Sequence, residues 1–131
     1  MSMIMLNDES VSATTLLNDF IKSRLESYKN EENQKRVKFS IEFWATIDRN
    51  DDIRVINEQR YKAYYNQLSD LVKSGIARGE FRDNIDIDAT VFSIISLMDG
   101  IALMVSVMNQ SLDYMKIETS INMLINYLKN L

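Results

Sequence analysis

The scarcity of helix-breaking residues is the feature that most constrains this chain. It has no proline and only three glycines in 131 residues. Since these two residue types end helices and form tight turns, long helices are favoured. Apolar residues recur at spacings of three and four, which predicts helices over residues 11–28, 34–47, 52–77, 87–108 and 112–131. We therefore predict an all-α bundle of five to six helices, forming one domain over residues 11–131. Residues 1–10 are expected to be disordered or a cloning remnant.

Polar residues mark several predicted helix ends. Ser10 is placed to cap the first helix and Asp86 the fourth, because short oxygen-bearing side chains accept hydrogen bonds from free backbone N–H groups. Gly79 follows the third helix, where a left-handed residue commonly ends a helix. The chain between the third and fourth helices is therefore expected to be a short, well-defined connection.

Several kinds of chemistry are missing from the composition. The chain contains no histidine and no cysteine, which excludes Ser-His and Cys-His nucleophilic pairs and the usual zinc sites. The acidic run at residues 83–88 resembles a calcium loop, but Asp88 and Ile94 stand where that loop needs glycine and glutamate. A net charge of −4 argues against a main role in nucleic-acid contact. We predict no enzyme activity, no metal and no cofactor.

The last two predicted helices carry more apolar surface than a small bundle can cover. Residues 87–108 are apolar nearly all round, and small residues on one side allow close helix packing. Residues 112–131 carry a heptad stripe of the kind that packs against another helix. We predict that both helices form a four-helix interface in a homodimer. The predicted interface residues are Ser96, Gly100, Leu103, Val107, Ile117, Ile121, Leu124 and Leu128. Alternatively, both stripes are internal core.

Residues 91–108 are the one candidate for a membrane span. Asp99 lies near the middle of this window, where a charged side chain costs about 2.5–3.5 kcal/mol on insertion scales. The apolar start of the chain is shorter than a signal-peptide core. We therefore expect a cytoplasmic protein that makes no membrane contact.

Aromatic residues concentrate in the first four predicted helices and suggest a ligand pocket. Such sites are mostly apolar, with a few polar groups that fix the orientation of the ligand. Tyrosine hydroxyls, Glu42, Glu58 or Asp99 are candidates for these groups. The predicted ligand-binding residues are Phe20, Phe43, Trp44, Tyr61, Tyr65, Phe92, Met98 and Asp99. Two alternatives stay open: the aromatic residues are plain core, and Asp99 pairs with an arginine or a backbone group.

Three stretches together resemble a known family. They are EFWATIDRNDDIR at residues 42–54, YKAYYNQLSDLVKSGIARGEFR at 61–82 and DIDATVFSIISLMDGI at 86–101. Their order and spacing are similar to those of the C-terminal effector domain of TetR-family transcriptional regulators. That family has a Gly-x-x-x-Gly-Glu-Phe-Arg helix end and then an Asp-Gly-Leu sequence, with Ile101 here in place of the leucine. The resemblance covers the chain from about Leu16 to the C-terminus.

The resemblance implies a function that composition alone does not give. The first three helices would enclose a pocket against the fourth, and the last two would form the dimer bundle. A small lipophilic or aromatic effector would then control DNA binding through an N-terminal helix-turn-helix domain. No such module precedes Leu16 in this sequence, so the chain is expected to be a cut-down regulator or one that has lost its DNA-binding domain. The alternative function is a helical protein–protein interaction module without a ligand.

Overall fold

A computed structural model describes residues 10–46, 50–108 and 113–129. Within these residues the chain forms five α-helices and one short 3₁₀ helix. They are α1 (Ala13–Glu26), η1 (Ser27–Lys29), α2 (Glu31–Trp44), α3 (Asp51–Ala77), α4 (Ile87–Ser106) and α5 (Tyr114–Leu128). The predicted all-α fold and its five helices are confirmed, with ends that differ by a few residues. The prediction for residues 1–10 falls almost wholly outside the described part of the chain.

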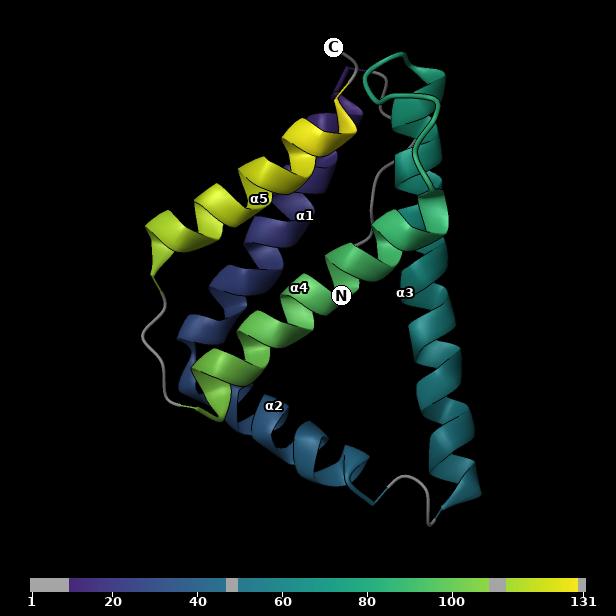
Figure 1. The fold of residues 1–131 in the computed structure, drawn as a ribbon. Helices are drawn as coiled ribbons and strands as arrows, with labels where there is room; N and C mark the ends of the chain where they lie inside the picture. The colour runs from purple at the N-terminus through teal and green to yellow at the C-terminus, as the bar shows by residue number, and fades with distance from the viewer. Residues whose placement is uncertain (1–9, 47–49, 109–112, 130–131) are drawn as a thin grey trace.

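Helix α1 lies at the centre of the bundle and contacts α3, α4 and α5 (Figure 1). Its inward stripe of Leu17, Ile21 and Leu25 is at most 2% exposed. Helix α2 lies across the C-terminal end of α1, where it contacts η1 and α4. The core is therefore made by α1, the second half of α3, α4 and α5. Its buried residues from the last three are Leu68, Leu71, Val72, Val91, Ile94, Ile95, Met98, Ala102, Val105, Ile117, Ile121, Ile125 and Leu128.

The two glycines at the end of α3 have different roles. Gly79 has a φ of +76°, a left-handed conformation that glycine adopts without strain, and it reverses the chain after the helix as predicted. The chain then turns back so that Phe81, which is 1% exposed, packs its ring against Gly75. A Cβ atom at Gly75 would overlap that ring. The first glycine therefore makes room for a side chain, and the second permits the turn that brings it there.

The turn at residues 79–82 joins three helices that are far apart in sequence. Glu80 accepts hydrogen bonds from the backbone N–H groups of Ala13 and Thr14, at 2.9 and 3.1 Å, and from the Thr14 hydroxyl at 3.0 Å. Its carboxylate therefore caps the start of α1. The Arg82 backbone N–H donates to the carbonyl of Leu128 at the end of α5, at 2.8 Å. Figure 1 shows the start of α1 and the ends of α3 and α5 gathered at one end of the molecule.

Side-chain caps fix the starts of the other helices. Asp86 accepts a hydrogen bond from the Ala89 N–H at 3.0 Å, which confirms it as the cap of α4. The predicted cap of α1 is wrong by two residues. Ser12, and not Ser10, accepts a hydrogen bond from the Thr15 N–H, at 3.0 Å. Helix α1 starts two residues later than predicted for this reason.

The heptad stripe of α5 faces the protein's own core. Ile117, Ile121 and Leu128 are 9%, 0% and 0% exposed, since this side of α5 packs against α1. The prediction that these three residues form a subunit interface is therefore corrected to a core assignment. A heptad stripe specifies that a helix packs against another helix, and here the other helix belongs to the same chain.

Candidate ligand site

A cavity of about 300 Å³ lies where the end of α1, η1, α2 and α4 meet. This volume is at the lower end of the range of about 300–1,000 Å³ that is usual for small-molecule sites. Helix α2 forms one wall and α4 the opposite one. The lining residues are Arg24, Ser27, Tyr28, Asn33, Arg36, Val37, Ser40, Ile41, Trp44, Asp99 and Ala102.

Helical spacing explains why these residues share one cavity. Arg36, Ser40 and Trp44 are four residues apart, so they lie on one face of α2. Asn30 starts α2 in the required direction, because its side chain accepts a hydrogen bond from the Glu32 N–H at 2.8 Å. The short link between η1 and α2 is fixed further by the Asn33 amide, which donates to the Ser27 carbonyl at 2.8 Å. The α2 wall is thus set by local hydrogen bonds.

The Arg24 side chain is positioned by aromatic residues beneath the cavity. Its guanidinium carbon lies 5.4 Å from the centre of the Tyr64 ring, a cation–π distance. The Tyr64 ring contacts that of Phe20 at 5.5 Å, and its hydroxyl lies 3.6 Å from the sulfur of Met98. Burial raises the pKa of Tyr64 to about 12, so this hydroxyl stays neutral and serves as a donor.

Asp99 brings a carboxylate to the α4 wall. Burial raises the pKa of Asp99 above its ordinary value, and the positive charge of Arg24 works against this rise. Within the part of the chain that the structure describes, ion pairs join Lys22 to Glu118 and Arg54 to Asp51, and none involves Asp99 or either arginine of the cavity. The predicted pairing of Asp99 with an arginine is therefore not a direct ion pair. Arg24 acts on Asp99 only through its charge at longer range.

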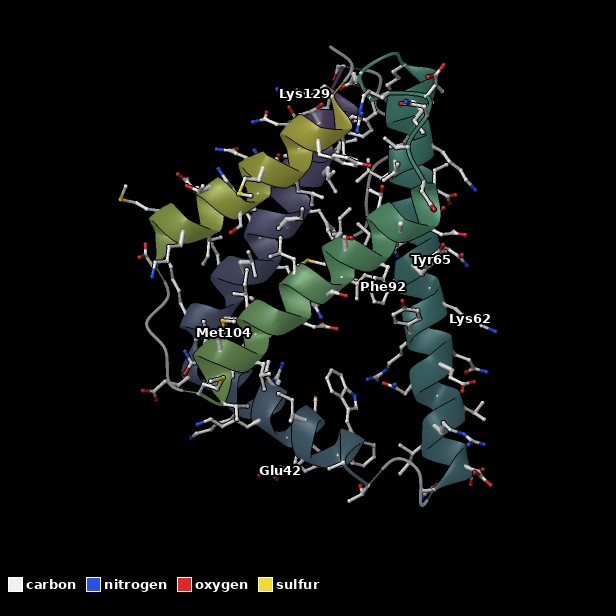
Figure 2. The ribbon with its side chains drawn as sticks, viewed as in Figure 1. Glu42, Lys62, Tyr65, Phe92, Met104 and Lys129 are labelled. Atoms are coloured by element: carbon white, nitrogen blue, oxygen red, sulfur yellow. The ribbon has the colours of Figure 1, made fainter. Side chains whose placement is uncertain are left out.

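Two of the eight predicted ligand residues, Trp44 and Asp99, line the cavity. Phe20 and Met98 are buried beneath it, at 8% and 2% exposure, and belong to the core. The remaining four lie outside it: Phe43, Tyr61 and Phe92 are exposed, and Tyr65 is half-buried with its hydroxyl donating to Asp88. Figure 2 shows Phe92 and Tyr65 on α4 and α3, and Glu42 on the outer side of α2. The aromatic cluster is therefore divided between core, surface and cavity.

The prediction missed the polar half of the lining. Arg24 lies four residues after Phe20 and four before Tyr28, so a charged residue interrupts an otherwise aromatic stripe of α1. A charged residue within an apolar stripe was the available signal, although the Arg24 side chain is itself exposed at the cavity. No comparable signal marks Arg36, because it lies among the charged and polar residues 31–36 at the start of α2.

The predicted interface residues divide by helix. Ser96 and Leu103 on α4 and Val107 just after it are exposed, and a Cβ at Gly100 would meet no atom within 4 Å. On α5, Leu124 is half-buried and the other three lie in the core. Further apolar side chains are exposed on α4 and just after it, namely Phe92, Met104 and Met108 (Figure 2 labels the first two). An open apolar face thus follows α4, and other large apolar side chains are exposed on α2, α3 and α5, such as Phe39, Ile56 and Met123.

Two further features of the structure concern a membrane span and a metal site. Helix α4 is long and apolar enough to cross a membrane by length and composition, but eight of its residues are buried in the bundle, as expected for a core helix. Among the described residues, no three acidic side chains gather closely enough to hold a metal ion.

Comparison with known proteins agrees with this architecture. The model of the tetracyclin repressor-like C-terminal domain family matches residues 16–118, which is most of the chain. No curated protein and no solved structure matches the sequence. The match spans all of the cavity lining and the 79–82 turn. The chain therefore belongs to the tetracyclin repressor-like C-terminal domain family.

Proposed function

We propose that this chain is the effector-binding and dimerisation domain of a TetR-like transcriptional regulator. It binds a small molecule in the cavity between α1, α2 and α4, and it pairs with a second copy through α4. Binding controls the DNA-binding domain of that regulator. A cytoplasmic location follows from that role. The chain itself has no enzymatic activity in this proposal.

One observation carries the proposal: the cavity and the open apolar face share α4. Asp99 and Ala102 line the cavity, and Leu103 lies on the open face one residue later. Successive residues of a helix are about 100° apart, so these are neighbouring faces of one rigid element. A ligand that moves α4 would therefore also change how two copies pack. A ligand shifts such an equilibrium by its difference in affinity for the two arrangements.

The open face of α4 suits close packing of two helices. Ser96 has a small side chain and Gly100 has none. They are flanked by Phe92, Leu103 and Val107, which are 62%, 39% and 44% exposed. An apolar stripe with small residues at its centre lets two helix backbones approach each other. The residues we propose for the interface are therefore those on α4 and just after it, together with Leu124, which is half-buried on α5.

The alternative function, an interaction module without a ligand, has less support. It depended on a heptad stripe of α5 that was free to bind a partner. Because Ile117, Ile121 and Leu128 are buried against the rest of the chain, that stripe offers no such surface. A cavity with charged walls is also unnecessary for a module that senses nothing.

Native mass spectrometry tests the proposal. The untagged chain should have twice the monomer mass at micromolar concentration, and a small bound adduct would begin to identify the effector. Leu103→Glu places a charge on the α4 face and should give a monomer. Ile56→Glu is the matched control, since Ile56 is exposed to 54% on α3, away from that face, and this variant should remain a dimer. A wild-type monomer would contradict the proposed interface.

A further inference from the structure

The cavity has an excess of positive charge on its walls. Arg24 and Arg36 supply two guanidinium groups, and Asp99 supplies the one carboxylate. The protein as a whole has a net charge of −4, so this local balance runs against the general trend. Neither guanidinium forms an ion pair with another described side chain. Arg24 does have the Tyr28 side chain as a hydrogen-bond partner. Since a guanidinium carries five N–H donors, both arginines still have donors for another partner.

The α2 wall presents both polar and apolar groups. Its lining residues alternate along the helix, with Arg36 and Ser40 polar and Val37, Ile41 and Trp44 apolar. A ligand held at one end by the guanidinium groups would have its body against these apolar side chains. Guanidinium groups match carboxylates especially well, because their planar N–H groups can donate two parallel hydrogen bonds.

We propose that the effector is a small carboxylate with an aromatic or aliphatic body, bound by Arg24 and Arg36 through its charge and by Val37, Ile41 and Trp44 through its body. This inference rests on the proposed function and specifies its ligand. The cavity volume of about 300 Å³ limits the ligand to a compact molecule. The body of this ligand is the lipophilic or aromatic group predicted from the sequence, and the carboxylate is an added feature.

Asp99 is compatible with an anionic ligand. The charged and titratable groups around it are Arg24 and Tyr28 from the α1–η1 side, Arg36 from α2 and Tyr64 from α3. Because burial raises the pKa of Asp99, this carboxylate binds a proton more readily than an ordinary aspartate does. A carboxylate in the cavity would raise this pKa further, and the protonated Asp99 would then donate a hydrogen bond to it. Binding should accordingly strengthen as the pH falls toward the raised pKa of Asp99.

Matched pairs of probes test the proposal by isothermal titration calorimetry on the full chain. Benzoate, phenylacetate and hexanoate are each compared with the neutral amide of the same shape, and benzylamine and inorganic phosphate are included. At least one carboxylate should bind about ten-fold or more tightly than its amide, because the charged hydrogen bonds are lost in the amide. Arg36→Gln should weaken that carboxylate by a similar factor. Arg60→Gln, which removes the same charge from the exposed part of α3, should leave its affinity unchanged.

Each other outcome overturns the proposal in a recognisable way. Tighter binding of benzylamine, lost in Asp99→Asn, would assign a cationic ligand. Equal binding of acids and amides would assign a neutral one, and phosphate binding alone would assign an inorganic anion. In these cases the proposed sensor function survives and only the ligand class fails. If no probe binds, the carboxylate assignment fails, and a chain that is also monomeric by mass spectrometry loses the sensor function as well.

Discussion

The two ends of α1 are built in opposite ways. At the N-terminal end, Glu80 accepts three hydrogen bonds and the Arg78 guanidinium donates to the Val11 carbonyl at 2.6 Å. At the C-terminal end, Arg24 and Asp99 face a cavity and form no ion pair within the described chain. One end has its polar groups satisfied by the protein itself, and the other has polar groups that a ligand can satisfy.

This difference separates the fixed frame of the domain from its variable part. The residues of the 79–82 turn hold α1, α3 and α5 together, and none of them lines the cavity. Four substitutions test this difference, beginning with the one expected to be most destabilising.

Phe81→Ala should be the most destabilising change. Its ring is 1% exposed between α3 and the end of α5, and emptying such a site costs about 3–5 kcal/mol of the free energy of unfolding. Urea denaturation followed by circular dichroism measures the loss. Phe39→Ala, at a side chain that is 68% exposed, is the control and should change stability by less than about 0.5 kcal/mol. Equal losses in the two variants would show that the turn does not anchor the fold.

Gly75→Ala should destabilise by about 1–3 kcal/mol, because the new methyl group would overlap the Phe81 ring and force the turn outward. Thermal melting of the variant checks this. Asn57→Ala, at an exposed position of the same helix, is the control and should leave the melting temperature nearly unchanged. A tolerated alanine at position 75 would mean that the turn can shift freely, contrary to the fixed-frame interpretation.

Glu80→Gln should cost about 1–2 kcal/mol, since charge-assisted hydrogen bonds to the start of α1 are weakened. Burial alone would raise the pKa of Glu80, but the hydrogen bonds from Ala13 and Thr14 outweigh it and lower the pKa. The stabilisation is therefore present above the unfolded-state pKa and is lost as the pH falls through the folded-state value. The difference from wild type should disappear in acid, which urea titrations at several pH values would detect. Glu58→Gln, at an exposed position, should show no such pH dependence.

Asp99→Asn should have the smallest effect, and of opposite sign. Since the folded-state pKa of Asp99 is raised, its contribution to stability is full below the unfolded-state pKa and is lost as the pH rises through the folded-state value. Asparagine removes that loss, so the variant should be slightly more stable at pH 7, by about 0.5 kcal/mol or less because the side chain is partly solvated. The two proteins should converge near pH 3. A less stable variant at pH 7 would indicate that Asp99 is held by partners of its own.

The sequence predicted the helices and their order because apolar spacing is a local property. The Asp86 cap and the Gly79 turn were predictable for the same reason. What could not be predicted is which helix each apolar face meets. The stripe of α5 could face the same chain or another one, and only the tertiary arrangement decides that it faces α1. The aromatic residues posed the same problem: Trp44 lines the cavity, whereas Tyr61 is exposed outside it.

The length of α3 has a mechanical consequence. Its 27 residues form one continuous helix, of which only the second half, around Leu68 and Val72, is packed into the core. Residues 54–63 are exposed throughout and extend beyond the core. At 1.5 Å per residue, Asp51 lies about 26 Å along the helix from Leu68, so a tilt of about 10° there displaces the start of the helix by about 4 Å. A small movement inside the bundle is therefore magnified at the exposed end of α3.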